Sequence, residues 1–252
     1  MCPWRRDLIS GLLGNDLIAF QLDRDRRNFL VAAREELSLE TTRNTVRIGN
    51  RIVAVKAVPI GVDYDRIQRI AHDPDLDIEI KKLRRELNLD TPIVGIGVDR
   101  LDYTKGVIER LDALELLLQR RPDLCDKLTF VQIGVPSRSR LPSYVDVAEA
   151  IDRKVDQINK NYGLGRDLIH YRKSALRIRR LVALYRLANF CIVSSLHDGM
   201  NLVAKEFVAA REDDDGVLIL SEMAGAAQQL HDASIINPVS YTHLTLPTSD
   251  LV

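Results

Sequence analysis

The chain has 252 residues, of which 46% are hydrophobic and 29% are charged, and its 36 basic and 36 acidic residues give a formal net charge of zero. This composition is ordinary for a globular protein of one or two domains with a substantial core. Zero net charge excludes the overall basic character of a typical nucleic-acid-binding protein, and no apolar run approaches the roughly 20 residues of a membrane-spanning helix. We therefore expect neither nucleic acid nor a membrane as a partner.

The first ten residues, MCPWRRDLIS, lack the apolar core of a secretory signal. The three cysteines, Cys2, Cys125 and Cys191, are isolated in the sequence and form no CxxC pair. This spacing favours neither a disulfide framework nor a zinc site. We expect a cytoplasmic protein.

The first 88 residues contain two predicted helices, a polar stretch and three predicted strands. The helices are residues 5–13 and 25–37, and the polar stretch 63–88 carries apolar residues at helical spacing. The strands are residues 16–20, 46–48 and 52–58, and the Gly-Asn pair between the last two indicates a hairpin. These strands are too few for a whole α/β domain. We interpret this part as the end of one, with a domain boundary near residues 88–91.

From residue 92 onward, short apolar runs alternate regularly with helical patterns. The six predicted strands are residues 93–98, 128–133, 168–171, 190–194, 217–220 and 234–236. The helices between them are residues 107–119, 142–162, 176–187, 202–211 and 225–230. This alternation is typical of a doubly wound parallel sheet, whose ligands bind at the carboxyl ends of the strands.

Residues 239–252, VSYTHLTLPTSDLV, break the alternation with a run that is rich in Thr, Ser and Pro and has no helical period. We interpret this stretch as a non-native tail. The chain is then expected to be truncated at both ends.

The segment HDGMNLVAKE, His197–Glu206, follows a predicted strand and opens a predicted helix. Asp198 and Asn201 suit helix capping, Gly199 lets a ligand approach the backbone, and the free N–H groups of a helix start attract anions. If the segment is helical throughout, Asp198 and Glu206 are separated by about 12 Å of rise. Two carboxylates so placed could hold hydroxyls at the two ends of a nucleotide-diphosphate sugar. The alternative is an ordinary capped helix with solvated charges.

A second segment, VDRLDYTKG, also lies between a strand and a helix, with Arg100 and Lys105 on either side of a turn. Two cations in this position can neutralise a diphosphate. The alternative is that Arg100 pairs on the surface with Asp99 or Asp102, which would contribute little stability.

A third segment, GVPSRSR, could present Arg138 to the same cleft, although a solvated loop arginine is the alternative. His197 has no orienting partner in the sequence, so we do not assign it as a general base. The sequence contains no GxGxxG after a strand, no GxxxxGK[ST] loop, no HExxH and no GxSxG. These absences disfavour a dinucleotide fingerprint, a phosphate loop, a zinc protease and a serine hydrolase.

The segments VDRLDYTKG, PSR and HDGMNLVAKEFVAAR together resemble the trehalose-6-phosphate synthases, which are retaining glycosyltransferases of family 20 with the two-domain GT-B fold. The resemblance extends from about Cys2 to Pro238. It implies an α/β chain in which residues 1–88 are the C-terminal part of a Rossmann-like acceptor domain and residues 89–238 a nearly complete Rossmann-like donor domain. The implied reaction moves glucose from UDP-glucose to glucose 6-phosphate, giving α,α-trehalose 6-phosphate.

The resemblance also implies roles for individual residues. Arg100 and Lys105 would hold the donor diphosphate, Asp198 the donor glucose and Glu206 the ribose, while Arg138 would bind the phosphate of glucose 6-phosphate. The backbone would complete the donor site at Gly199, Met200, Asn201, Leu202 and Val203. Arg100, Lys105 and Asp198 would be the catalytic residues. No metal, cofactor or protein nucleophile is implied.

Two departures from the family pattern leave alternatives open. The glycine-bearing loop and the histidine-bearing segment of the family would lie before Met1, so we expect the chain as written to have little transferase activity. A glucosylglycerol-phosphate synthase-like transferase and a non-catalytic nucleotide-sugar sensor remain alternatives. The choice among uridine, adenosine and guanosine as the donor base, and homo-oligomerisation, also stay open.

Overall fold

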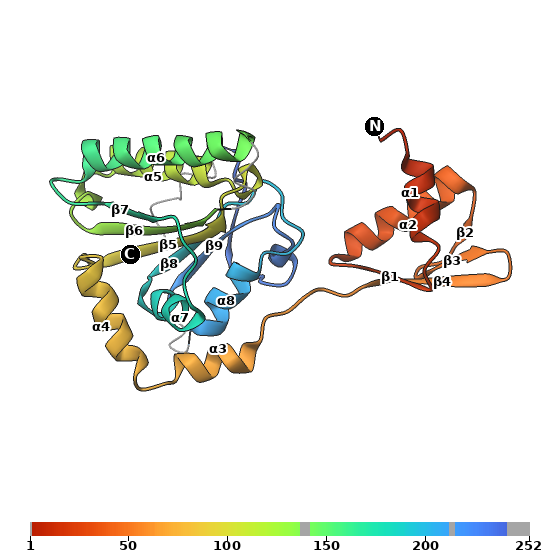
Figure 1. The fold of residues 1–252 in the computed structure, drawn as a ribbon, viewed down its shortest axis with the longest axis horizontal. Helices are drawn as coiled ribbons and strands as arrows, with labels where there is room; N and C mark the ends of the chain where they lie inside the picture. Colours follow the sequence, from red (N-terminus) through yellow and green to blue (C-terminus); the bar gives the residue numbers. More distant parts are fainter. Residues whose placement is uncertain (1, 137–141, 212–214, 241–252) are drawn as a thin grey trace. The chain divides into compact units, whose positions relative to one another are not determined.

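The computed structural model describes residues 2–136, 142–211 and 215–240 of the chain. These residues form two compact units, Met1–Ile60 and Gly61–Val252 (Figure 1). Each unit has its own sheet and its own apolar core.

The first unit is a small sheet covered by two helices. Its helices are α1 (Arg5–Leu12) and α2 (Asp23–Leu37), and its strands are β1 (Leu17–Phe20), β2 (Glu40–Thr41), β3 (Thr45–Ile48) and β4 (Arg51–Ala57). The sheet order is β1-β4-β3-β2, with β1 parallel to β4 and the other pairs antiparallel. Val53 and Val55, two residues apart and both buried, face the core with Phe29 of α2. The predicted hairpin is confirmed.

The second unit is a six-stranded parallel sheet between helices, as the alternation predicted. Its strands are β5 (Ile93–Arg100), β6 (Leu128–Val135), β7 (Ile169–Arg172), β8 (Phe190–Val193), β9 (Val217–Ser221) and β10 (Ser234–Ile236). Its α-helices are α3 (Tyr64–Ala71), α4 (Leu76–Glu86), α5 (Val107–Arg120), α6 (Pro142–Tyr162), α7 (Ile178–Leu187) and α8 (Leu202–Ala210). Every described strand pair in this sheet is parallel.

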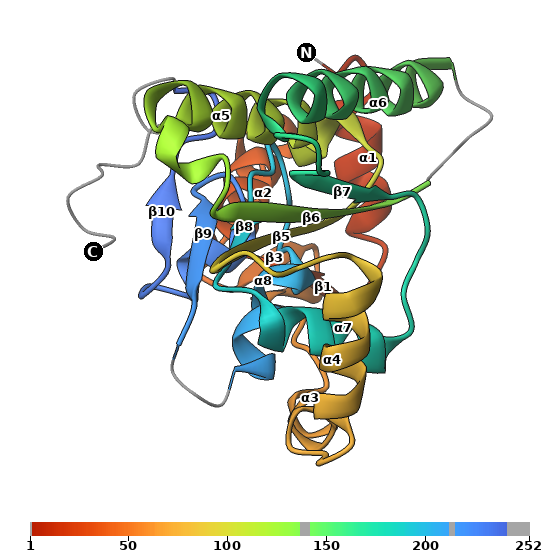
Figure 2. The same ribbon diagram turned by 90° about the vertical axis from the view of Figure 1, so that its left-hand side faces the viewer.

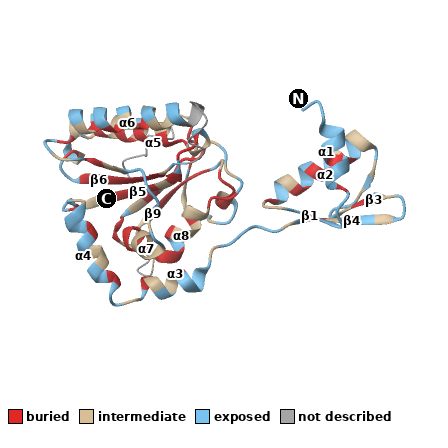
Figure 3. Cartoon of the chain, in the orientation of Figure 1, coloured by how far each residue is buried: buried red, intermediate tan, exposed pale blue. Residues whose placement is uncertain are grey.

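The sheet order is β10-β9-β8-β5-β6-β7, so the strand order reverses between β5 and β8. Helices α5 and α6 cover one face of the sheet, and α7 and α8 cover the other (Figures 1 and 2). Because both faces are covered, β6 is buried from Leu128 to Gly134 and is mostly apolar, with Thr129 and Gln132 as its buried polar residues (Figure 3). Leu111 and Leu118 of α5 pack in this core with Ile151 and Ile158 of α6.

The division between the units differs from the boundary near residue 88 that the sequence predicted. It falls after Ile60, which places α3 and α4 in the second unit. The reason is packing: α4 lies against α7, α3 lies against α7 and α8, and Leu83 of α4 is buried. In addition, the Gln68 side chain donates to the carbonyl of Ala209 at 2.7 Å. The helical spacing was correct, but it could not show which core the helices join.

Three smaller differences concern short elements. Residues 225–230 form a 3-10 helix, Gly225–Gln228, in place of the α-helix predicted there. The two-residue strand β2 and the 3-10 turns Tyr103–Lys105 and Pro122–Leu124 were not predicted. Most of the predicted tail, residues 241–252, lies outside the described residues. Among those that are described, no helix is long and apolar enough to cross a membrane.

Candidate functional site

The reversal of strand order places two of the predicted segments side by side. β5 and β8 are paired, with Gly95 opposite Phe190 and Ile96 opposite Cys191. The chain leaves β5 toward α5 on one face of the sheet and leaves β8 toward α8 on the other. The two connections therefore diverge at the carboxyl ends of neighbouring strands, which is where open α/β sheets bind ligands.

Lys105 and Asp198 meet at this point. The Lys105 Nζ lies 2.7 Å from the Asp198 Oδ2, and the two side chains are only 14% and 15% exposed. Lys105 follows β5 and Asp198 follows β8, so the ion pair joins the two connections. We refer to Arg100, Lys105, Asp198 and Asn201 as the switch-point cluster.

Asp198 is held by several donors besides Lys105. The Asn201 Nδ2 donates to its Oδ2 at 3.1 Å, and the Met200 N–H lies 3.4 Å from its Oδ1. Burial opposes ionisation of this carboxyl, but the Lys105 ammonium and these donors together outweigh burial and lower the pKa of Asp198 below its ordinary range. Asp198 is therefore a carboxylate at neutral pH.

Asn201 begins α8 in a strained backbone conformation. Its φ of 78° lies in the region that only a minority of non-glycine residues adopt. Its Oδ1 accepts a hydrogen bond from the Ala204 N–H, while its Nδ2 binds Asp198. Both halves of the amide are thus used, one to cap the helix and one to fix the carboxylate. Such strain is common at functional sites.

A third connection, after β9, completes the framework. The Asp198 N–H donates to the carbonyl of Met223, and the Asp198 carbonyl accepts from the Gly225 N–H. The connections after β5 and β8 are also tied, because the Leu196 N–H donates to the Thr104 carbonyl at 2.8 Å. These backbone bonds fix the position of the switch-point cluster.

Arg100 is the exposed cation of the cluster. It ends β5, and its side chain forms no ion pair with any of the described residues. The surface pairing with Asp99 that the sequence left open does not occur, because Asp99 binds Arg110 at 2.6 Å. Asp102 caps the turn instead, accepting from the Thr104 N–H and hydroxyl.

Glu206 lies on α8, whereas Asp198 precedes that helix. The predicted separation of about 12 Å rested on an unbroken helix from Asp198 onward. The assumption of an unbroken helix is wrong, because α8 begins only at Leu202. The Tyr185 hydroxyl, on a fully buried side chain, donates to the Glu206 Oε2 at 3.1 Å. Burial raises the pKa of Glu206, and the hydrogen bond from Tyr185 offsets part of that rise.

The other predicted site residues differ in their exposure and in their place in the fold. Gly199 is exposed, Met200 is buried, and Leu202 and Val203 form the first turn of α8. Arg138 lies outside the described residues. His197 is exposed, with its backbone N–H directed to the Thr104 carbonyl.

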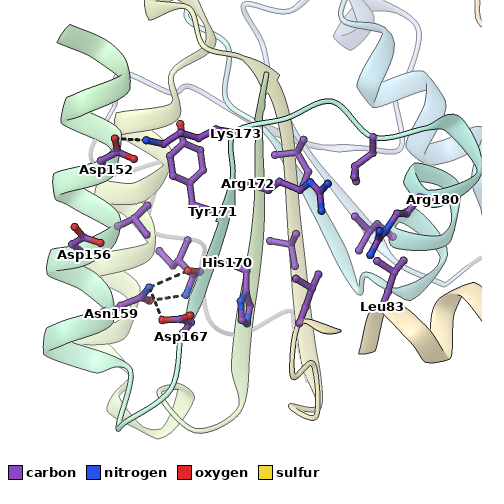
Figure 4. Close-up of a pocket in the computed structure, with 17 residues that line it drawn as sticks. Leu83, Asp152, Asp156, Asn159, Asp167, His170, Tyr171, Arg172, Lys173 and Arg180 are labelled. Atoms are coloured by element: carbon purple, nitrogen blue, oxygen red, sulfur yellow. Dashed lines mark hydrogen bonds and ion pairs between the residues drawn. The ribbon is translucent and has the colours of Figure 1, made fainter. Parts of the chain in front are cut away.

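A cavity of about 350 Å³ lies elsewhere in the second unit, around the edge strand β7 (Figure 4). Its lining includes Asp152, Tyr171, Arg172 and Arg180 and none of the switch-point cluster. At this edge, the Asn159 side-chain amide accepts a hydrogen bond from the Ile169 N–H at 2.8 Å and donates one to the Ile169 carbonyl at 3.0 Å. We assign the functional site to the switch-point cluster because the converging charges and the strained helix cap lie there.

Sequence reasoning missed three buried residues that support the cluster. They are Arg110 on α5, Ser194 after β8 and Tyr185 on α7. A charged residue in the first turn of α5, together with the polar residues Asp99 and Gln132 in largely apolar strands, could have identified Arg110. Among the residues that the structure describes, no group of three His, Cys, Asp or Glu side chains could hold a metal ion.

The lowered pKa of Asp198 predicts a pH-dependent contribution to stability. The folded-state pKa lies below the unfolded value of about 4, so the stabilisation is fully present above about pH 5 and is lost as the pH falls through the folded pKa. D198N should therefore be less stable than the wild type at pH 7 by about 1 kcal/mol. The difference should shrink toward pH 3, measured by urea unfolding followed by circular dichroism.

Asp123 provides the matched control for this experiment. Its pKa is also lowered, by Arg121, but the pair is exposed on the surface. The stability of D123N should differ little from that of the wild type at every pH. A D198N deficit that is the same at pH 7 and pH 3 would contradict the assigned ionisation.

Known proteins are similar to this chain in sequence and in fold. A profile described as Glycosyltransferase family 20 matches residues 1–247. A trehalose-6-phosphate synthase of Mycobacterium sp. (strain KMS) is 42% identical over 247 residues, which cover 94% of this chain and 50% of that protein.

Solved structures give the same result. An α,α-trehalose-phosphate synthase (UDP-forming) from Burkholderia xenovorans, in complex with glucose-6-phosphate, is 34% identical with a TM-score of 0.88, covering 96% of this chain and 54% of that one. A structure from E. coli bound with UDP-2-fluoro glucose is 32% identical with a TM-score of 0.87, again covering 96% and 54%. The chain thus spans about half the length of these relatives. The predicted α/β fold of GT-B type and the family resemblance are confirmed.

Proposed function

The chain belongs to glycosyltransferase family 20, and we propose that its second unit binds UDP-glucose at the switch-point cluster. In this proposal the whole protein transfers the glucose to glucose 6-phosphate with retention, giving α,α-trehalose 6-phosphate. The observation that carries the proposal is the buried Lys105–Asp198 pair at the carboxyl ends of β5 and β8, beside the exposed Arg100. The related structures in complex with glucose-6-phosphate and bound with UDP-2-fluoro glucose support the choice of substrates.

The cations of the cluster suit the leaving group. When the bond between glucose and the diphosphate breaks, negative charge develops on the diphosphate oxygens. Arg100 and Lys105 supply fixed positive charge there, and the first-turn N–H groups of α8 at Leu202 and Val203 have no acceptor within the helix. Such preorganised donors stabilise the transition state more than the ground state.

The carboxylates suit the hydroxyls of the donor. Asp198 is ionised and accepts hydrogen bonds, so it can bind hydroxyls of the glucose. Glu206 lies further along α8 and can bind the ribose, with Tyr185 fixing one of its oxygens. A hydrogen bond to an ionised group contributes about 1.5–3 kcal/mol.

The remaining assignments are also proposals. Arg138 would bind the phosphate of glucose 6-phosphate, and no metal or cofactor would take part. We also propose a cytoplasmic location, because all three cysteines are free thiols.

A thermal-shift experiment tests donor binding. UDP-glucose at a hundred times its Kd should raise the apparent stability of the chain by about 2.7 kcal/mol. NAD, which has a diphosphate but neither uridine nor glucose, and glucose 6-phosphate alone serve as controls. A cooperative melt that UDP-glucose does not shift would contradict the proposal, as would an equal shift with NAD.

A further inference from the structure

A buried arginine, Arg110, contacts residues that adjoin the switch-point cluster. Arg110 is in the first turn of α5 and its side chain is fully buried. Its Nη1 donates to the Asp99 Oδ2 at 2.6 Å and to the Gln132 Oε1 at 2.8 Å, and its Nε donates to the Ser194 Oγ at 3.1 Å. One guanidinium therefore joins α5 to β5, to β6 and to the residue that follows β8.

Two of these contacts, those with Asp99 and Ser194, lead to residues of the cluster. Asp99 is the residue before Arg100, so its carboxylate fixes the end of β5 from which Arg100 projects. The Ser194 hydroxyl donates to the Gly106 carbonyl at 2.7 Å, next to Lys105. The same guanidinium is thus linked to the backbone next to both cations that the proposed function places on the diphosphate.

The Arg110 guanidinium occupies the space beside Gly97. A Cβ on Gly97 would lie 2.2 Å from the Arg110 Nη1 and 2.7 Å from the Gln132 Oε1, so any other residue there would displace these side chains. The Asp99, Gln132 and Ser194 side chains are also buried. Removing the guanidinium would leave the Asp99 carboxylate buried without its cation, which is costly in any protein interior.

The contacts of Arg110 exceed what anchoring the helix requires. The Arg110 N–H already joins the α5 ladder by donating to the Gly106 carbonyl, and Leu111, Leu114 and Leu118 bury the apolar face of the helix. A buried ion pair is weak evidence for stability, because its desolvation costs about as much as the attraction gains. We therefore look for the effect of the Arg110–Asp99 pair in the positions of the neighbouring residues and not in stability.

We propose that Arg110 is a positioning residue of the diphosphate site: through Asp99 and Ser194 it holds the backbone that presents Arg100 and Lys105. The inference rests on the proposed function, because it assumes that these two cations bind the diphosphate of UDP. Displacement of charged groups by even 1 Å reduces binding and catalysis strongly.

The test compares UDP affinity with thermal stability in four variants of the chain. R110M removes the charge and the hydrogen bonds, R110K keeps the charge, and S194A removes one hydroxyl with little change in volume. R166M is the control: the half-buried Arg166 also donates to several groups, including the Thr129 hydroxyl and the carbonyls of Cys125 and Leu128, but at the amino end of β6. UDP dissociation constants are measured by calorimetry at a temperature where each variant is folded.

We expect R110M to raise the Kd for UDP about tenfold or more, R110K to recover part of that loss and S194A to raise the Kd about threefold. R166M should lower the melting temperature while leaving the Kd within about twofold of the wild type. If R110M does not fold, S194A decides. Wild-type affinity in folded R110M or S194A would overturn the inference. A wild-type chain that binds no UDP would overturn the proposed function itself.

Discussion

Replacing Lys105 by alanine is expected to weaken UDP binding about 100-fold, which corresponds to about 2.7 kcal/mol. Two effects contribute. The variant loses a charge-assisted hydrogen bond to the diphosphate, and it leaves the Asp198 carboxylate, which Lys105 contacts at 2.7 Å, unpaired beside the anion. Calorimetric titration of UDP into wild type and K105A measures the change.

Lys154 provides a closely matched control. It is 17% exposed, against 14% for Lys105, and it pairs with Asp112 and Glu115 between α5 and α6. K154A should lower stability and leave the UDP affinity unchanged. In the double variant K105A/D198N, removal of the repelling carboxylate should restore part of the lost affinity. A K105A loss no larger than that of K154A would contradict the role of Lys105.

Replacing Gly106 by alanine is expected to destabilise the second unit by about 3 kcal/mol and to abolish detectable UDP binding. The φ of Gly106 is 62°, and a Cβ there would lie 2.1 Å from the carbonyl oxygen of Ser194. The obstacle is backbone, so the connection after β5 and the end of β8 would have to separate. That movement would pull Lys105 away from Asp198.

Gly165 separates the two causes of this effect. Its φ is 87°, but a Cβ there would have no neighbour within 4 Å. G165A should therefore cost only backbone strain, about 1 kcal/mol, and should bind UDP normally. Urea unfolding and UDP titration of both variants provide the test. Equal destabilisation by G106A and G165A would show that the contact with Ser194 is unimportant.

Much of the second unit could be predicted because its strands are local apolar runs. The runs from Ile93 and from Leu128 each form a strand buried on both faces, and the turn signals between them mark the helices. The edge strand β2 was missed because two polar residues, Glu40 and Thr41, show no period. The boundary between the two units falls after Ile60 and not near residue 88, because the amphipathic spacing of α3 and α4 does not reveal which unit these helices join.

The site could be predicted in part, for a related reason. Arg100, Lys105 and Asp198 are visible because polar residues follow apolar strands, and the structure brings Lys105 and Asp198 into contact. The distance between Asp198 and Glu206 could not be predicted, because the path of the chain before α8 depends on the positive φ of Asn201. Arg110 and Tyr185 were missed because their roles depend on partners more than 20 residues away, such as Gln132 and Glu206.

A crystal structure of the chain with UDP-glucose would locate the donor site directly. We expect the diphosphate within hydrogen-bonding distance of the Lys105 Nζ and of the first-turn N–H groups of α8, with the ribose at Glu206. A nucleotide bound instead in the cavity around β7, or a switch-point cluster that stays empty at saturating UDP-glucose, would contradict it.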